Sequence, residues 1–200
     1  KDARQSLLYA REAAEISDQL KLPADAMIHV AIGRACSRIP DNEAALKSFE
    51  EALSIASRQK DTTKIAWVHI YTGHFYLNLS NVPSALYQFD QAIGLGDYLD
   101  DSKILADAWF GKALVYNIFG EYPAMYNALR QYLNYADTLA EQRRIADAWR
   151  LTGTYFRSIN DFREAIDANQ RSFEVAESVN DSILMGAALN HMAWYHYEMG

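Results

Sequence analysis

Histidine is the side chain in this 200-residue sequence with the widest chemical use, because it can ligate metals and transfer protons. The chain has five histidines: His29, His69, His74, His191 and His196. His191 and His196 lie five residues apart in HMAWYH, whereas helical zinc motifs space two histidines four residues apart on one face. His29 and His69 occupy a position that holds tryptophan elsewhere in the chain, so we interpret them as packing or hydrogen-bonding residues. The sequence therefore predicts no metal site.

Other catalytic signatures are equally weak. The Gly-Leu-Gly of residues 94–96 is too short to form a phosphate-cradling loop, and no serine nucleophile elbow occurs. Asp107 and Asp147 both precede Ala-Trp, and they lie forty residues apart. We interpret this acidic pair as one position of a repeat and not as an acid and its base. The sequence predicts a protein that is not an enzyme and that needs no cofactor.

The bulk composition excludes several classes of partner. The chain has 19 lysines and arginines against 26 aspartates and glutamates, a net charge of −7, and no basic patch, so nucleic acid is not an expected partner. No apolar run reaches the length of a membrane-spanning helix. The chain begins at Lys1 and shows no signal peptide, so we expect a piece of a longer protein, with the cytoplasm favoured and targeting information removed.

A spacing of 40 residues organises the sequence. Small residues recur at this step, namely at Gly33, Gly73, Ala113, Gly153 and Ala193. A second column lies three residues later and is mostly aromatic: Cys36, Tyr76, Tyr116, Phe156 and His196. A third column lies four residues before the first: His29, His69, Trp109, Trp149 and Leu189. The three columns fall on one side of a helix of 3.6 residues per turn, which indicates a helical repeat.

Turn and capping signals divide each repeat into two helices, here called helix A and helix B. Ser or Thr precedes the apolar runs in DTTKI, DDSKI and NDSIL and is interpreted as an N-cap, while Pro83 and Pro123 suit the first turn of a helix B. We predict an all-α superhelix of about ten antiparallel helices with no strands. The single predicted domain comprises an orphan helix B at 3–20, four full repeats at 24–60, 61–100, 101–140 and 141–180, and an orphan helix A at 182–199.

These columns resemble the tetratricopeptide repeat (TPR), whose pattern is W-x2-L-G-x2-Y, then A-x3-F, then Pro, every 34 residues. WRLTGTYF at 149–156 and AWFGKALVY at 108–116 match the first half, and ALKSF at 45–49 and ALYQF at 85–89 match the second. The leucine column and the closing proline are not kept, and the period is longer. Such long repeats are similar to the TPR arrays of bacterial signalling regulators and peptide receptors. The resemblance implies a solenoid with a concave inner face.

The candidate binding residues form the stripe of each helix A next to the packing columns, which the resemblance places on the concave face. They are Met27, Val30, Arg34, Trp67, Ile70, His74, Phe110, Leu114, Asn117, Arg150, Thr154, Arg157, Asn190 and Trp194. Aromatic rings, arginine and asparagine suit the recognition of a peptide. Alternatively, Trp67 and Phe110 pack against neighbouring helices. The lysine and asparagine that other TPR domains use to clamp a C-terminal carboxylate are absent from these columns.

The predicted function is a non-catalytic scaffold or sensor module that binds a protein or peptide segment within a larger signalling protein. The alternative is a regulatory domain gated by a small molecule or a short signalling peptide. Two regions are candidates for self-association. One is the tyrosine-rich, lysine-poor second and third repeats. The other is the last helix A, where Met185, Leu189 and Ala193 lack a helix B to cover them, so we expect the array to continue.

Overall fold

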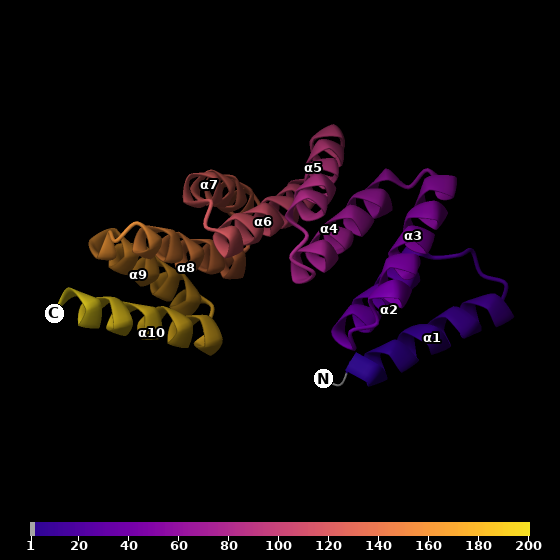
Figure 1. Cartoon of the computed structure of the whole chain (residues 1–200), viewed down its shortest axis with the longest axis horizontal. Coiled ribbons are helices and arrows are strands. Elements are labelled where there is room, and N and C mark those ends of the chain that lie inside the picture. The colour runs from indigo at the N-terminus through magenta and orange to yellow at the C-terminus, as the bar shows by residue number, and fades with distance from the viewer. Residues whose placement is uncertain (1–2) are drawn as a thin grey trace. The chain divides into compact units, whose positions relative to one another are not determined.

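The structure of the chain is a computed structural model that describes residues 3–200, and these residues form α-helices with no strand (Figure 1). The helices are α1 (Ala3–Gln19), α2 (Ala26–Arg38), α3 (Asn42–Gln59), α4 (Thr62–Asn78), α5 (Val82–Leu99), α6 (Ser102–Phe119), α7 (Tyr122–Thr138), α8 (Gln142–Ser158), α9 (Phe162–Ser178) and α10 (Ser182–Met199). The even-numbered helices are the A helices and α3, α5, α7 and α9 are the B helices. The prediction of an all-α fold of about ten helices is confirmed.

Aspartate caps most of these helices. Asp61 accepts a hydrogen bond from the backbone N–H of Lys64, and Asp101 and Asp181 cap α6 and α10 in the same way. The sequence interpretation placed the caps one residue later, on Ser or Thr, and is wrong there. The aspartate is the cap because it precedes the first helical residue and its carboxylate can reach the free amides of the first turn. Such a capping hydrogen bond stabilises a helix by about 1 kcal/mol. Pro83 and Pro123 lie in first turns as predicted.

The chain forms two compact units, Lys1–Asp100 with α1 to α5 and Asp101–Gly200 with α6 to α10. In the first unit α2 packs on α3 and α4 packs on α5, and the A helices α2 and α4 also touch. In the second unit α6 packs on α7, and α9 lies between and packs on both α8 and α10, which also touch each other. Each unit therefore contains one pair of A helices that contact each other; α2 and α4 each pack on their own helix B, whereas α8 and α10 share α9.

The small-residue column is where each helix A crosses its helix B. A Cβ atom added at Gly33 would lie 2.9 Å from the Phe49 ring, and one at Gly73 would lie 2.8 Å from the Phe89 ring. Repeat three instead packs Ala113 in one buried cluster with the smaller Leu129. The size of the helix A residue thus complements the size of its helix B partner, as close packing requires.

Repeat four replaces the large apolar partner with a polar one. Asn169 is fully buried, and its Nδ2 donates a hydrogen bond to the backbone oxygen of Ala165 at 2.9 Å. A Cβ atom at Gly153 would lie 1.9 Å from that Nδ2. Glycine at 153 therefore leaves the space that the asparagine side chain occupies, and the buried amide is available to side chains of the next helix A.

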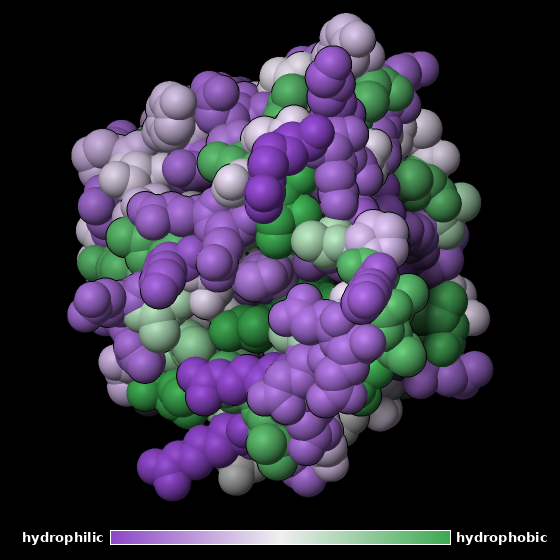
Figure 2. Space-filling view, turned by 90° about the vertical axis from the view of Figure 1, so that its right-hand side faces the viewer, coloured by the Kyte–Doolittle hydropathy of each residue, from purple (hydrophilic) through white to green (hydrophobic). Residues whose placement is uncertain are grey.

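The surface is mixed in polarity. Hydrophilic residues dominate the face shown in Figure 2, and hydrophobic residues appear between them in small groups. Within the described residues, no helix has the length and apolar character that a membrane span requires.

Candidate functional site

All of the predicted binding residues lie on A helices, but the structure does not bring all of them to a surface. Val30 and Ile70 are each only 2% exposed. Val30 belongs to the buried cluster that includes Val68 of the neighbouring helix A, so its side chain points toward the adjacent repeat. These two side chains are core residues, and they leave the candidate site.

Phe110 follows the alternative interpretation, in which it packs against neighbouring helices. Its ring lies 5.1 Å from that of the buried Tyr132, between α6 and α7. Trp67 is half-buried, and its ring lies 6.1 Å from that of Tyr71 on the same helix. The half-buried members of the set are Met27, His74, Leu114, Asn117, Arg150 and Thr154, and the exposed ones are Arg34, Arg157, Asn190 and Trp194.

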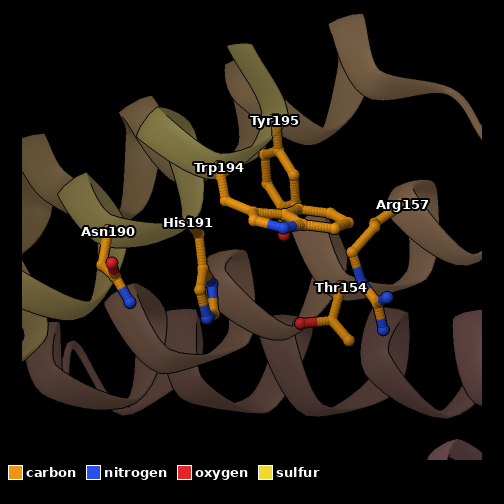
Figure 3. A pocket seen from close by; sticks show the side chains of 6 residues that line it. All are labelled: Thr154, Arg157, Asn190, His191, Trp194 and Tyr195. Carbon is orange, nitrogen blue, oxygen red and sulfur yellow. The ribbon is translucent and has the colours of Figure 1, made fainter. Parts of the chain in front are cut away.

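Four predicted residues come together in one pocket between α8 and α10, here called the α8–α10 pocket. Its volume is about 310 Å³, and Thr154, Arg157, Asn190, His191, Trp194 and Tyr195 line it (Figure 3). The two α8 residues face the four from α10 across the opening. His191 and Tyr195 were not predicted as site residues, and no pattern in the sequence alone distinguishes them.

The wall of this pocket pairs a cation with an aromatic ring. The Arg157 guanidinium carbon lies 5.7 Å from the centre of the Trp194 ring. Contacts with Phe162 at 6.3 Å and with Tyr195 at 5.5 Å hold the Trp194 ring, although 42% of the residue is exposed. Within residues 3–200, the structure shows no carboxylate paired with Arg157. A positioned and unneutralised guanidinium is thus available at the opening.

The buried amide of Asn169 contacts two residues of the pocket lining. Its Oδ1 lies 3.3 Å from Nδ1 of His191, and its side chain also hydrogen-bonds that of Tyr195. Because the Asn169 oxygen can only accept, this contact requires a proton on Nδ1 of His191. The neutral imidazole then presents Nε2 as an acceptor.

The electrostatics of the pocket keep His191 neutral. Burial lowers the pKa of His191 below its ordinary value, and the positive charges of Arg150 and Arg157 lower the pKa further. Arg150 is itself paired with Asp147, whose Oδ1 accepts from Nε at 3.1 Å and from Nη2 at 2.6 Å. Arg157 therefore supplies the main positive charge available to a ligand here.

A separate polar network joins α6 to α8. Arg144 donates from Nη1 to Oδ1 of Asp107 at 2.6 Å and from Nη2 to Oδ2 at 3.2 Å, and it also pairs with Glu141. Burial raises the pKa of the adjacent Tyr132 well above its ordinary range. The repeated aspartates, Asp107 and Asp147, thus each pair with an arginine, and they act as packing residues. No cluster of His, Cys, Asp and Glu that could hold a metal ion occurs in the described part of the chain.

A second pocket lies in the first unit between α2 and α4, here called the α2–α4 pocket. Its volume is about 280 Å³, and Arg34, Ser37, Arg38, Phe49, Tyr71, His74, Phe75 and Asn78 line it. The predicted residues Arg34 and His74 are among them. The guanidinium carbon of Arg34 lies 4.7 Å from the centre of the Tyr71 ring.

Solved structures match this chain although no protein-family model and no curated protein does. BtubC (BKLC) from P. vanneervenii is 15% identical with a TM-score of 0.71, over 98% of this chain and 89% of that one. The apo form of RapI is 13% identical with a TM-score of 0.75, and this chain spans 58% of its length.

The names of two further matching structures mention a bound factor and a sensor, respectively. A Rap protein complexed with Competence and Sporulation Factor is 15% identical with a TM-score of 0.68, and this chain spans 59% of it. A Signal Transduction ATPase with Numerous Domains from Pyrococcus horikoshii, with a tetratricopeptide repeat sensor, is 18% identical with a TM-score of 0.73. This chain spans 30% of that protein. At these identities the matches show the fold, and the prediction of a TPR-like helical-repeat fold is confirmed.

Proposed function

We propose that this chain is a non-catalytic module that binds a peptide or an extended protein segment along its A helices, with the α8–α10 pocket as its main anchor point. The observation that carries the proposal is the Arg157–Trp194 pair, a cation and a large ring that lie at a surface opening, where no carboxylate of the described chain forms an ion pair with the cation. Arginine and tryptophan are the residues most often found at the centres of binding sites.

The remaining groups of the pocket suit a peptide backbone. Asn190 offers both a donor and an acceptor, Thr154 offers a hydroxyl, and Nε2 of His191 accepts a hydrogen bond. A peptide exposes alternating N–H and C=O groups that need such partners when water is displaced. The Rap protein that was solved with Competence and Sporulation Factor, and the tetratricopeptide repeat sensor of the Pyrococcus protein, support a sensor or scaffold role within a larger signalling protein.

A regulatory domain that binds a small molecule is the second candidate. The volume of the α8–α10 pocket, about 310 Å³, lies at the lower end of the range for small-molecule sites. Its position between two A helices favours a longer ligand that continues beyond it.

Panning a random peptide library on the purified chain tests the proposal. The matched control is the Trp194→Ala variant, because this large half-exposed ring should contribute most of the contact area. We expect peptides that bind the chain and bind the variant at least tenfold more weakly, by fluorescence anisotropy. Recovery of the same peptides on both proteins would place binding elsewhere, and recovery of none, with binding of metabolites in a thermal-shift screen, would favour the small-molecule candidate.

A further inference from the structure

The α2–α4 and α8–α10 pockets occupy equivalent positions in the repeat. Their lining residues lie 120 residues apart, which is three periods of 40 (154 − 34 = 120). The corresponding residues are Arg34 and Thr154, Ser37 and Arg157, Tyr71 and His191, His74 and Trp194, and Phe75 and Tyr195. Each pocket therefore forms where a helix A meets the next helix A, in one unit and in the other.

The two pockets contain the same four kinds of side chain in exchanged positions. On the first helix A, the α2–α4 pocket has Arg34 followed by Ser37. The α8–α10 pocket has the hydroxyl first and the arginine second, as Thr154 and Arg157. On the next helix A, the α2–α4 pocket has Tyr71 followed by His74, and the α8–α10 pocket has the histidine first, as His191 and then Trp194. Both exchanges occur together, so the arginine still lies over the large ring, at 4.7 Å for Arg34 and Tyr71 and at 5.7 Å for Arg157 and Trp194.

The repeat alone does not produce this set. The four exchanged positions correspond in α6 and α8, within the second unit, to Leu114, Asn117, Leu151 and Thr154, which include neither an arginine nor an aromatic ring; the fifth position, Tyr155, keeps its ring. Because the successive A helices α6 and α8 lack the set, the repeat alone does not account for the arginine, ring, histidine and hydroxyl that both pockets share.

Both pockets are positively charged in an acidic chain. Their lining residues include no aspartate or glutamate, although the chain has a net charge of −7. Over residues 3–200 neither Arg34 nor Arg157 forms an ion pair, whereas Arg144 and Arg150 are paired with aspartates. An incoming anion can therefore reach the two stacked guanidinium groups without breaking an existing pair, and Arg38 adds a further positive charge to the α2–α4 pocket.

We propose that the two pockets are a matched pair of carboxylate sites, each taking an aspartate or glutamate side chain of a peptide ligand. The proposal rests on the proposed peptide-binding function and names the ligand chemistry. A planar guanidinium matches a carboxylate through two parallel hydrogen bonds, and the ring beneath it holds the guanidinium plane in place. One available guanidinium in the α8–α10 pocket balances the single charge of a carboxylate, whereas phosphopeptide sites use clusters of arginines. The expected ligand is an acidic segment.

Calorimetric titration with defined peptides tests this proposal. The probes are a peptide of alternating glycine and glutamate, blocked at both ends, and its glycine–glutamine twin. We expect the glutamate peptide to bind at least tenfold more tightly, and Arg34→Met and Arg157→Met each to weaken its binding about tenfold, as the loss of a charge-assisted pair implies. Arg58→Met and Arg130→Met are matched controls, because they remove the same charge from exposed positions on the B helices α3 and α7.

Several outcomes would overturn the proposal. Equal binding of both blocked peptides would exclude side-chain carboxylates, and tight binding of an unblocked glycine–glutamine peptide would assign the sites to a chain terminus. An effect of Arg157→Met without one of Arg34→Met would show that the pockets are not a pair, and equal losses in the control variants would show only a general charge effect. Library peptides that bind through Trp194 but do not respond to either arginine variant would leave the proposed function standing while this inference fails.

Discussion

At the scale of the residue, the partner of an arginine decides its role on this surface. Arg144 and Arg150 lie on the same helix as Arg157, but only Arg157 has a ring in place of a carboxylate. The sequence placed Arg150 and Arg157 together as binding residues, because stripe positions do not reveal which carboxylates lie near. The structure separates a paired arginine from an available one.

This difference predicts opposite effects of two similar substitutions. Arg157→Ala should weaken peptide binding while changing the free energy of unfolding by less than about 0.5 kcal/mol, as for an ordinary surface position. Arg144→Ala should cost about 2 kcal/mol of stability, because it leaves the half-buried carboxylate of Asp107 without its two hydrogen bonds. Urea unfolding and peptide titration of both variants measure the two effects. A large loss of stability in Arg157→Ala would mean that this arginine is a packing residue.

His191 predicts a pH dependence of stability. Burial and the neighbouring arginines lower its folded-state pKa below the unfolded value of about 6.5. Below that pH the unfolded chain binds more protons than the folded chain at this residue, so the stability that is present at neutral pH falls as the pH falls. His191→Gln should reduce this loss between pH 7.5 and 5.5 in urea unfolding, because glutamine cannot take up the proton. An unchanged slope in the variant would contradict the assignment.

At the scale of the element, the contact between helix A and helix B determines which residues are accepted. The sequence predicted a close crossing at the small column, and the distances at Gly33, Gly73 and Gly153 agree. What the sequence could not predict is the pocket beside it. His191 and Tyr195 are held at the pocket by contacts with Asn169 of α9, and such contacts depend on side chains brought together across a helix pair.

The crossing at Gly153 predicts a compensating pair of substitutions. Gly153→Ala should destabilise by about 1–3 kcal/mol, because the new methyl group would overlap the Asn169 amide. Combining it with Asn169→Leu reproduces the Ala113 and Leu129 pair of repeat three and should recover most of the loss. Gly94→Ala is the control. Nothing lies within 4 Å of its added Cβ, so this variant should gain about 0.5–1 kcal/mol. A double variant no more stable than Gly153→Ala would show that the crossing cannot be repacked.

At the scale of the whole molecule, the repeat period predicted the number of helices and the fold class, because several columns shared one step. Val30 and Ile70 were placed on the wrong side, whereas Asn190 of the same column is exposed. A helical stripe gives an angle around one helix, but whether that angle meets water depends on the next helix A, which the sequence does not position. Sequence therefore predicts burial best for positions at the centre of a buried helix face and worst for positions at its edges.

The terminal helix α10 tests how stability is distributed along the array. It contacts α9 and α8 and buries Leu184, Ala188 and Tyr195, while Leu189 is 50% exposed. In a repeat protein each helix is stabilised chiefly by its neighbours, so an element with one covered face should open at lower free energy. Hydrogen exchange should show weaker protection of the α10 amides than of the α8 amides. Equal protection would indicate that the other face of α10 is covered in solution.

The division of the chain into two compact units predicts that the second unit can fold by itself. The second unit has its own buried clusters, one with Met125, Leu129 and Leu151 and one with Tyr132. Because repeat proteins depend on contacts between neighbours, residues 101–200 should fold without the first unit. A fragment of this range should show a helical circular dichroism spectrum and a cooperative melt. It should also retain the α8–α10 pocket, and so bind the glycine–glutamate peptide through Arg157, more weakly than the whole chain because one of the two proposed sites is absent. A helical fragment that binds as tightly as the whole chain would show that the first unit contributes nothing to the ligand, and an unfolded fragment would show that the units are one cooperative body.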